Sequence, residues 1–153
     1  TIQLAKRGQL MTHDKDKTVM KLLRVENLLE TNFSPVKPDQ TLGEFVKVIA
    51  KSERNVFPVV DDEDNYLGIV FINDVREIIF KPEKYDSVLV SDLMFTPEEH
   101  VTPDMSMEEV ARMFQVTGNY NLPVIREGKY IGFVSRANVF HTYRKMLKDF
   151  SED

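Results

Sequence analysis

The stretch VKPDQTLGE at residues 36–44 decides the fold, because it returns as VTPDMSMEE at residues 101–109. Each copy places a hydroxyl residue three positions before a glutamate, Thr41 before Glu44 and Ser106 before Glu109. This spacing is typical of a capping box, which begins an α-helix. The match extends without a gap from residues 25–60 to residues 90–125, at an offset of 65. A repeat of this length predicts two copies of one structural unit.

The apolar pattern after each box predicts the rest of the unit. Apolar residues recur at helical spacing, which indicates one buried stripe on the first helix of each repeat. Short β-branched runs at 56–60, 67–72, 122–125 and 131–134 predict paired strands, joined by polar turns at 61–65 and 126–129. A second helix is expected over residues 73–80 and again over 136–150. The two stripes are Leu42, Phe45, Val46 and Ile49, and Met107, Val110, Ala111 and Phe114.

The unit is therefore an α/β (α+β) arrangement, β-α-β-β-α twice, with Val36 and Val101 as short leading strands. Repeat 1 is predicted at 25–82 and repeat 2 at 88–150, after a basic segment at 1–24. Because helices cover only one face of each sheet, we expect the two copies to pack sheet to sheet about a pseudo-twofold axis, with two equivalent clefts. The last helix also carries an apolar seam suited to a partner. The seam consists of Val139, Tyr143, Met146, Leu147 and Phe150.

Composition excludes several classes of function. A net charge of −5 argues against general nucleic-acid binding, which needs an excess of Lys and Arg. No apolar run reaches the roughly 20 residues of a membrane helix. With no cysteine there is neither a disulfide nor a thiolate nucleophile. Residues 1–24 nevertheless hold six Lys or Arg against two Asp. They form either a solvated tail or a juxtamembrane segment on the cytoplasmic side.

The repeated boxes resemble the cystathionine β-synthase (CBS) domain, and the tandem pair resembles a Bateman module. The residues that carry the resemblance are VKPDQT and VTPDMS, the PVV and PVI strands at 58 and 123, and the glycines Gly68 and Gly132. CBS pairs bind adenosine nucleotides such as ATP, ADP or AMP. The resemblance implies a G-h-h-T/S-x-x-D motif, in which the Asp accepts from the ribose hydroxyls and the Ser or Thr donates to a phosphate.

In this chain the motif is split between the repeats. GIVFINDV at 68–75 keeps Asp74 for the ribose but has Phe71 where the hydroxyl belongs. GFVSRANV at 132–139 keeps Ser135 for a phosphate but has Asn138 in place of the Asp. Without a ligand, Asp74 is an ordinary first-turn residue and Ser135 an ordinary N-cap. We expect one weak site at Asp74, or none.

Other residues complete the expected site. Arg136 is a candidate for phosphate, as is Arg54, although an exposed arginine usually meets only water. Tyr120 is a candidate for stacking on the purine, beside Val36 and Val101; the alternative is a core aromatic. The three histidines share no metal-ligand spacing, and no nucleophile–base pair is present, so we expect neither a metal site nor an enzyme.

TIQLAKRGQ at 1–9 looks like the segment that leaves the last membrane helix of prokaryotic ClC-type chloride channels and transporters. It suggests a cytoplasmic tail that regulates a channel domain of the same chain, at the membrane's cytoplasmic face, as a homodimer. No cofactor is required by this interpretation. The alternative is a ligand-free dimerisation scaffold.

Overall fold

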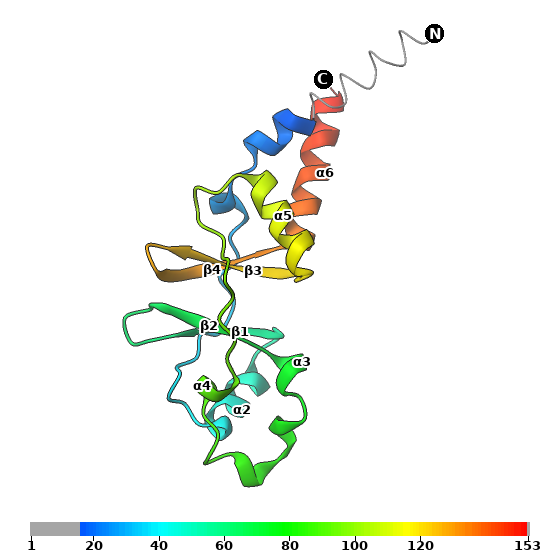
Figure 1. The fold of residues 1–153 in the computed structure, drawn as a ribbon. Helices are drawn as coiled ribbons and strands as arrows, with labels where there is room; N and C mark the ends of the chain where they lie inside the picture. The colour runs from blue at the N-terminus through cyan, green and yellow to red at the C-terminus, as the bar shows by residue number, and fades with distance from the viewer. Residues whose placement is uncertain (1–15, 153) are drawn as a thin grey trace. The chain divides into compact units, whose positions relative to one another are not determined.

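The computed structural model describes residues 16–152 of the chain, which form a mixed α/β fold of short helices and two two-stranded sheets (Figure 1). These residues divide into two compact units. Unit 1 consists of residues 16–29, 101–122 and 134–152, and unit 2 consists of residues 30–100 and 123–133. Each unit thus contains segments from both sequence repeats. The predicted packing of the two repeats stays a prediction.

Unit 2 is built on an antiparallel hairpin of β1 (Val56–Val60) and β2 (Tyr66–Phe71). Every β1 side chain is buried, as expected of a short strand that packs on both faces. Val36 adds a single parallel bridge to Val59, so the predicted leading strand is one residue long. Helix α2 (Leu42–Lys51) presents its predicted stripe to this core. The buried members of the core are Val36, Leu42, Phe45, Phe57, Val59, Val70, Ile72, Val75 and Val90.

Unit 1 is built on two longer helices, α5 (Met107–Thr117) and α6 (Arg136–Glu152). Residues 16–22 are also helical and lead into the 3₁₀ turn η1 (Val25–Leu28). The hydroxyl of Tyr143 on α6 donates to the Asp16 carboxylate at 2.7 Å, which ties the first described residues to the last helix. Strands β3 (Asn121–Arg126) and β4 (Lys129–Ser135) form the second sheet, most of whose residues, 123–133, belong to unit 2.

The predicted helix starts and turns are confirmed. Thr41 Oγ1 accepts from the Glu44 N–H, and Ser106 Oγ from the Glu109 N–H, both at 3.2 Å. The shorter of the two hairpin turns places Glu127 and Gly128 at φ 51° and 80°. Two consecutive positive φ values are typical of a type I′ turn, which matches the twist of the strands on either side.

The predicted helix over 73–80 is wrong, because only α3 (Ile72–Val75) and two 3₁₀ turns, η2 (Ile78–Phe80) and η3 (Pro82–Lys84), are present there. The N-cap of α3 is Phe71, whose side chain offers the first-turn N–H groups no acceptor. Pro82 lacks the N–H that would bond to the Ile78 carbonyl. The Tyr85 hydroxyl donates to the Ile79 carbonyl at 2.5 Å, which occupies the next acceptor.

Residues 84–93, which include α4 (Val90–Leu93), close the first turn of α2. The N–H groups of Leu42 and Gly43 donate to the carbonyls of Val88 and Tyr85, at 2.7 and 3.1 Å. A Cβ on Gly43 would lie 3.2 Å from the Tyr85 Cβ, so a larger residue would press against Tyr85. Glycine at position 43 therefore permits this close approach.

Loss of the hydroxyl should change the free energy of unfolding differently at two tyrosines of unit 2. The Tyr66 hydroxyl is buried without a hydrogen-bond partner among residues 16–152, whereas the Tyr85 hydroxyl has one. An unpaired buried hydroxyl destabilises the fold, and a paired one stabilises it. We expect Tyr85→Phe to lower the free energy of unfolding by about 1 kcal/mol, and Tyr66→Phe to leave it unchanged or raise it. Urea unfolding at pH 7 measures both, and a large loss in Tyr66→Phe would contradict the assignment.

The raised pKa of Tyr66 also predicts how the free energy of unfolding changes at alkaline pH. Burial raises the pKa of Tyr66 to about 12, so the folded chain keeps a proton that the unfolded chain loses near pH 10. The unfolded state then binds fewer protons, and stability falls as the pH rises from about 10 to 12. In Tyr66→Phe this fall should be smaller, as measured by urea midpoints across that range. An identical fall in both proteins would assign it to other groups.

Candidate functional site

The junction between β4 and α6 in unit 1 holds the retained hydroxyl of the split motif. Ser135 is the last residue of β4, and its Oγ accepts from the Asn138 N–H at 3.1 Å. This is the geometry of an N-cap, as the alternative interpretation of Ser135 predicts. The bond uses only a lone pair, because a hydroxyl has one donor and two acceptor positions. The Ser135 proton therefore stays available to a ligand.

Tyr120 lies at the same junction. Its carbonyl accepts from the Arg136 N–H at 2.9 Å, which connects the residue before β3 to the first residue of α6. Its side chain is 74% exposed, so it is not the core aromatic that the alternative interpretation expects. Unit 1 thus gathers four of the predicted site residues at one strand-to-helix junction. We call this set half-site B: Tyr120, Ser135, Arg136 and Asn138.

The two remaining side chains of half-site B already have partners inside unit 1. The Arg136 guanidinium lies over the ring of Phe140, 5.6 Å from its centroid, one helical turn along α6. The Asn138 amide donates to the Leu28 carbonyl at 3.5 Å, a long and weak bond. To reach a phosphate, Arg136 would give up a contact worth roughly 0.5–1 kcal/mol at an exposed site.

Asp74 occupies the equivalent junction between β2 and α3 in unit 2, which we call half-site A. Its side chain is exposed, and no hydrogen bond or ion pair engages it within the part of the chain that the structure describes. Phe71, in the hydroxyl position, is half-buried and packs against the cluster of Phe33, Val56, Ile69 and Phe133. Half-site A therefore offers a free carboxylate for a ribose and nothing from Phe71 for a phosphate.

Val36 and Val101, the other two residues expected at the base, are completely buried. The N–H of Val36 donates to the Pro58 carbonyl and its carbonyl accepts from the Val60 N–H, both at 2.9 Å. The Val36 side chain and its main-chain polar groups are thus committed to the fold. Neither valine side chain is exposed to a ligand.

Arg54, which was also considered for phosphate, is held within unit 2. Its guanidinium contacts the Glu30 carboxylate at 3.4 Å and the Asn32 side-chain oxygen. It also lies 4.3 Å from the centroid of the Phe33 ring. These partners satisfy the cation, so Arg54 is removed from the candidate site. Sequence reasoning missed this cluster, because its members lie more than 20 positions apart.

Two further findings on residues 16–152 concern a metal site and a membrane span. No group of three His, Cys, Asp or Glu side chains is arranged to hold a metal ion. No helix in the same range is both long and apolar enough to cross a membrane. The segment TIQLAKRGQ and His13 lie outside the described residues.

The cap at Ser135 can be tested without any ligand. We expect Ser135→Ala to lower the free energy of unfolding by about 1 kcal/mol, the usual cost of losing an N-cap hydroxyl. Ser91→Ala is the matched control, because the Ser91 side chain is exposed and its N–H, not its hydroxyl, bonds to the Pro38 carbonyl. Urea unfolding measures both variants. Equal stability of the two would contradict the cap.

Comparison with known protein families identifies both repeats. The sequence model of the family described as "CBS domain" matches residues 25–81 and again residues 90–145. The chain is 30% identical over 105 residues to inosine-5'-monophosphate dehydrogenase of Methanocaldococcus jannaschii. The aligned region covers 68% of this chain and 20% of that enzyme. It is 27% identical over 119 residues to homoserine O-acetyltransferase of Methanococcus vannielii, covering 77% and 24%. The chain thus spans a quarter or less of these two relatives.

Solved structures match over most of the chain. The plant protein CBSX2 in complex with AMP is 25% identical, with a TM-score of 0.68 over 80% of this chain and 97% of that one. A CBS domain from a membrane protein of Sphaerobacter thermophilus is 20% identical, with a TM-score of 0.69 over 89% and 96%. The cytosolic domain of the Mg²⁺ channel MgtE in complex with ATP is 23% identical, with a TM-score of 0.67 over 77% and 48%.

Proposed function

The chain belongs to the CBS domain family and carries two copies of the domain, and from this premise we propose that it is a regulatory module that binds an adenosine nucleotide. The ligand is AMP, ADP or ATP, and the relative CBSX2, solved with AMP, supports this class. Binding changes how the module acts on a partner and involves no turnover. The regulation is thus a coupling free energy: the module binds the nucleotide more tightly in one state of the partner than in the other.

One observation carries the proposal, namely the free carboxylate of Asp74 at half-site A. An exposed carboxylate with no protein partner can accept from both ribose hydroxyls without breaking an existing bond. A hydrogen bond to an ionised acceptor is about twice as strong as a neutral one. Asp74 is therefore the proposed ribose ligand of the stronger site, although Phe71 gives that site no hydroxyl for a phosphate.

Half-site B is the weaker of the two. Asn138 offers a neutral amide to a ribose, and this amide already bonds to the Leu28 carbonyl. Ser135 retains its proton for a phosphate, and Tyr120 offers an exposed ring for a purine. Arg136 must leave Phe140 before it can contact a phosphate. Val36 and Val101 are proposed to border the base in half-sites A and B, respectively.

A second candidate function is a dimerisation scaffold without ligand. Of the predicted seam on the last helix, α6, Phe150 is 38% exposed and Val139 is buried, and Phe140, which lies outside the seam, is 45% exposed. Exposed aromatic side chains of this kind are typical of protein interfaces. Both proposed functions, the nucleotide sensor and the scaffold, include a homodimer, and they differ only in whether a nucleotide binds.

We further propose that the regulated partner is a membrane transport domain in the same polypeptide, with the module at the cytoplasmic face. The finer assignment, a prokaryotic ClC-type chloride channel or transporter, rests on TIQLAKRGQ at residues 1–9. The similarity in fold to the cytosolic domain of a Mg²⁺ channel is compatible with a membrane transport domain as partner but does not distinguish a chloride from a Mg²⁺ transport domain. Sequencing the gene upstream of residue 1 tests the assignment, and an upstream region without membrane helices would contradict it.

Thermal unfolding with millimolar AMP, ADP, ATP or S-adenosylmethionine tests nucleotide binding. A ligand of the folded state at a hundredfold excess over Kd adds about 2.7 kcal/mol, which corresponds to a rise of about 5–10 °C for a domain of this size. We expect a rise with at least one adenosine nucleotide, lost in Asp74→Ala because the ribose loses its acceptor. Asp149→Ala, an exposed carboxylate on α6, is the control and should keep the rise.

The outcomes separate the candidates. No rise with any of the four compounds would overturn the sensor and leave the scaffold. A rise that survives Asp74→Ala but disappears in Ser135→Ala would move the site to half-site B.

A further inference from the structure

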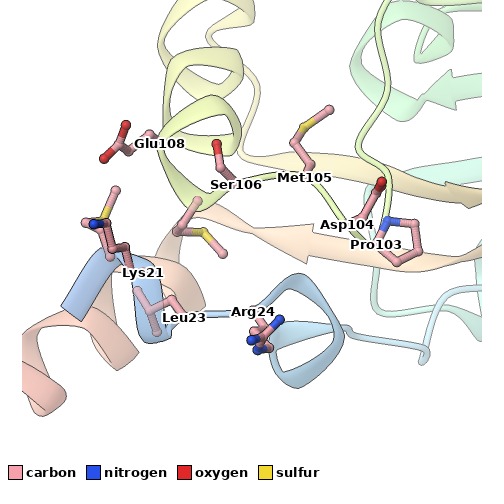
Figure 2. Close-up of a pocket in the computed structure, with 10 residues that line it drawn as sticks. Lys21, Leu23, Arg24, Pro103, Asp104, Met105, Ser106 and Glu108 are labelled. Atoms are coloured by element: carbon pink, nitrogen blue, oxygen red, sulfur yellow. The ribbon is translucent and has the colours of Figure 1, made fainter. Parts of the chain in front are cut away.

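A pocket opens in unit 1 at the start of α5 (Figure 2). Its volume is about 330 Å³, near the lower end of the range for small-molecule sites. One wall comes from residues 20–24 and the other from the loop and first turn at residues 103–108. No residue of half-site A or half-site B lines it. The lining residues are Met20, Lys21, Leu23, Arg24, Pro103, Asp104, Met105, Ser106, Met107 and Glu108.

We call the place where residues 20–24 meet the start of α5 the joint of unit 1. The corresponding joint of unit 2 lies between residues 84–91 and the start of α2. Extending the 65-residue offset upstream pairs Met20 with Tyr85 and Leu23 with Val88. The local backbones have one hydrogen bond in common, because Leu23 N–H donates to the Val19 carbonyl and Val88 N–H to the Lys84 carbonyl, both at 3.1 Å. The two segments differ in helix type, since residues 16–22 are α-helical and residues 82–84 form the 3₁₀ turn η3, but they share this hydrogen bond and can be compared position by position.

The joint in unit 2 is closed and the joint in unit 1 is open. In unit 2, Leu42 and Gly43 donate their N–H groups to Val88 and Tyr85. In unit 1 the corresponding donors are Met107 and Glu108, and their N–H groups have no acceptor among residues 16–152.

Two residue differences explain why one joint is closed and the other open. Gly43 lets Tyr85 approach so closely that even a Cβ would lie at 3.2 Å, whereas Glu108 carries a full side chain at the equivalent position. Tyr85 is itself replaced by Met20, which has no ring to fill the space. At the joint of unit 2, by contrast, Tyr85 lies so close that its Cβ and carbonyl oxygen are 3.2 and 3.5 Å from a Cβ placed on Gly43.

The closed joint shows which chemistry fits the open one. In unit 2, residues 85–88 offer α2 two carbonyl oxygens as acceptors and the aromatic ring of Tyr85. The pocket of unit 1 offers two free N–H donors and methionine and leucine side chains. Lys21 and Arg24 add positive charge to one wall, while Asp104 and Glu108 lie on the other (Figure 2). The mixed charge favours a single negative charge over the double charge of a phosphate.

We propose that this pocket binds a small monocarboxylate that carries an aromatic or apolar group. The carboxylate accepts from the N–H groups of Met107 and Glu108 and faces Lys21 and Arg24, and the apolar group packs among Met20, Leu23 and Met105. A bound molecule then fastens residues 20–24 to α5, as Val88 and Tyr85 fasten residues 84–91 to α2. The segment before the first repeat thereby gains a second, ligand-dependent attachment.

Amide NMR spectra of the intact chain test the proposal with three probes. N-acetyltyrosine supplies a carboxylate and a ring, tyramine a ring without a carboxylate, and inorganic phosphate an anion without a ring. We expect saturable shifts of the Met107 and Glu108 amide signals with millimolar N-acetyltyrosine, and none with the other two. Absence of shifts with N-acetyltyrosine, or equal shifts with phosphate, would overturn the proposal.

Variants connect the signal to the pocket. The double variant Met20→Tyr with Glu108→Gly recreates the closed joint, so it should stay folded by its NMR spectrum and lose the binding. Arg24→Gln should weaken binding about fivefold, the upper effect of one exposed ion pair, whereas Lys145→Gln, an exposed lysine on α6, should not. Binding that persists unchanged in the double variant would place the probe elsewhere and contradict the assignment.

Discussion

The first-turn N–H groups of each helix need acceptors, and the way each helix obtains them determines much of this structure. A helix leaves four such groups without partners inside the helix itself. Thr41, Ser106 and Ser135 supply side-chain acceptors to α2, α5 and α6, and these helices run for 10, 11 and 17 residues. Phe71 supplies none to α3, which ends after four residues. Phe71 thus provides neither a side-chain cap for α3 nor, under the proposed function, a hydroxyl for a phosphate.

The two repeats have therefore diverged in complementary ways. Half-site A has Asp74, the proposed ribose acceptor, on a short helix with no capping hydroxyl. Half-site B has the Ser135 hydroxyl and a long helix, but Asn138 offers an amide, which bonds to Leu28, where the first repeat has a carboxylate. The joints at the first helices diverged as well, since Gly43 admits Tyr85 where Glu108 leaves a pocket. Each difference follows from one or two residues against a shared backbone.

The sequence was sufficient for elements whose signals are local. The capping spacing of Thr41 and Ser106, the apolar run Val56–Val60 and the polar hairpin turns all appear where they were predicted. The predicted helix over 73–80 does not form as one piece, because Phe71 gives α3 no side-chain cap and Pro82 lacks an N–H for the next turn. Both residues are visible in the sequence. The identity of the family was also readable, because its boxes are short, repeated and specific.

Other features depend on contacts between distant residues and were not accessible. Nothing local indicates that Tyr143 bonds to Asp16 or that Arg54 is held by Glu30 and Asn32. Nor does anything local indicate that the Tyr120 carbonyl accepts from the Arg136 N–H, or that the Tyr120 side chain is exposed. The ligand roles of Asp74 and Ser135 stay predictions, since their geometry agrees both with helix chemistry and with nucleotide binding.

Calorimetric titration of the intact chain with AMP measures the inequality of the half-sites directly. A charged acceptor at Asp74 and a neutral, already bonded amide at Asn138 predict one saturable site per chain in the millimolar range or below. Two equivalent sites per chain would contradict this account, because they would require Asn138 and Phe71 to serve as well as the residues they replace. Complete absence of saturable binding would contradict nucleotide sensing itself.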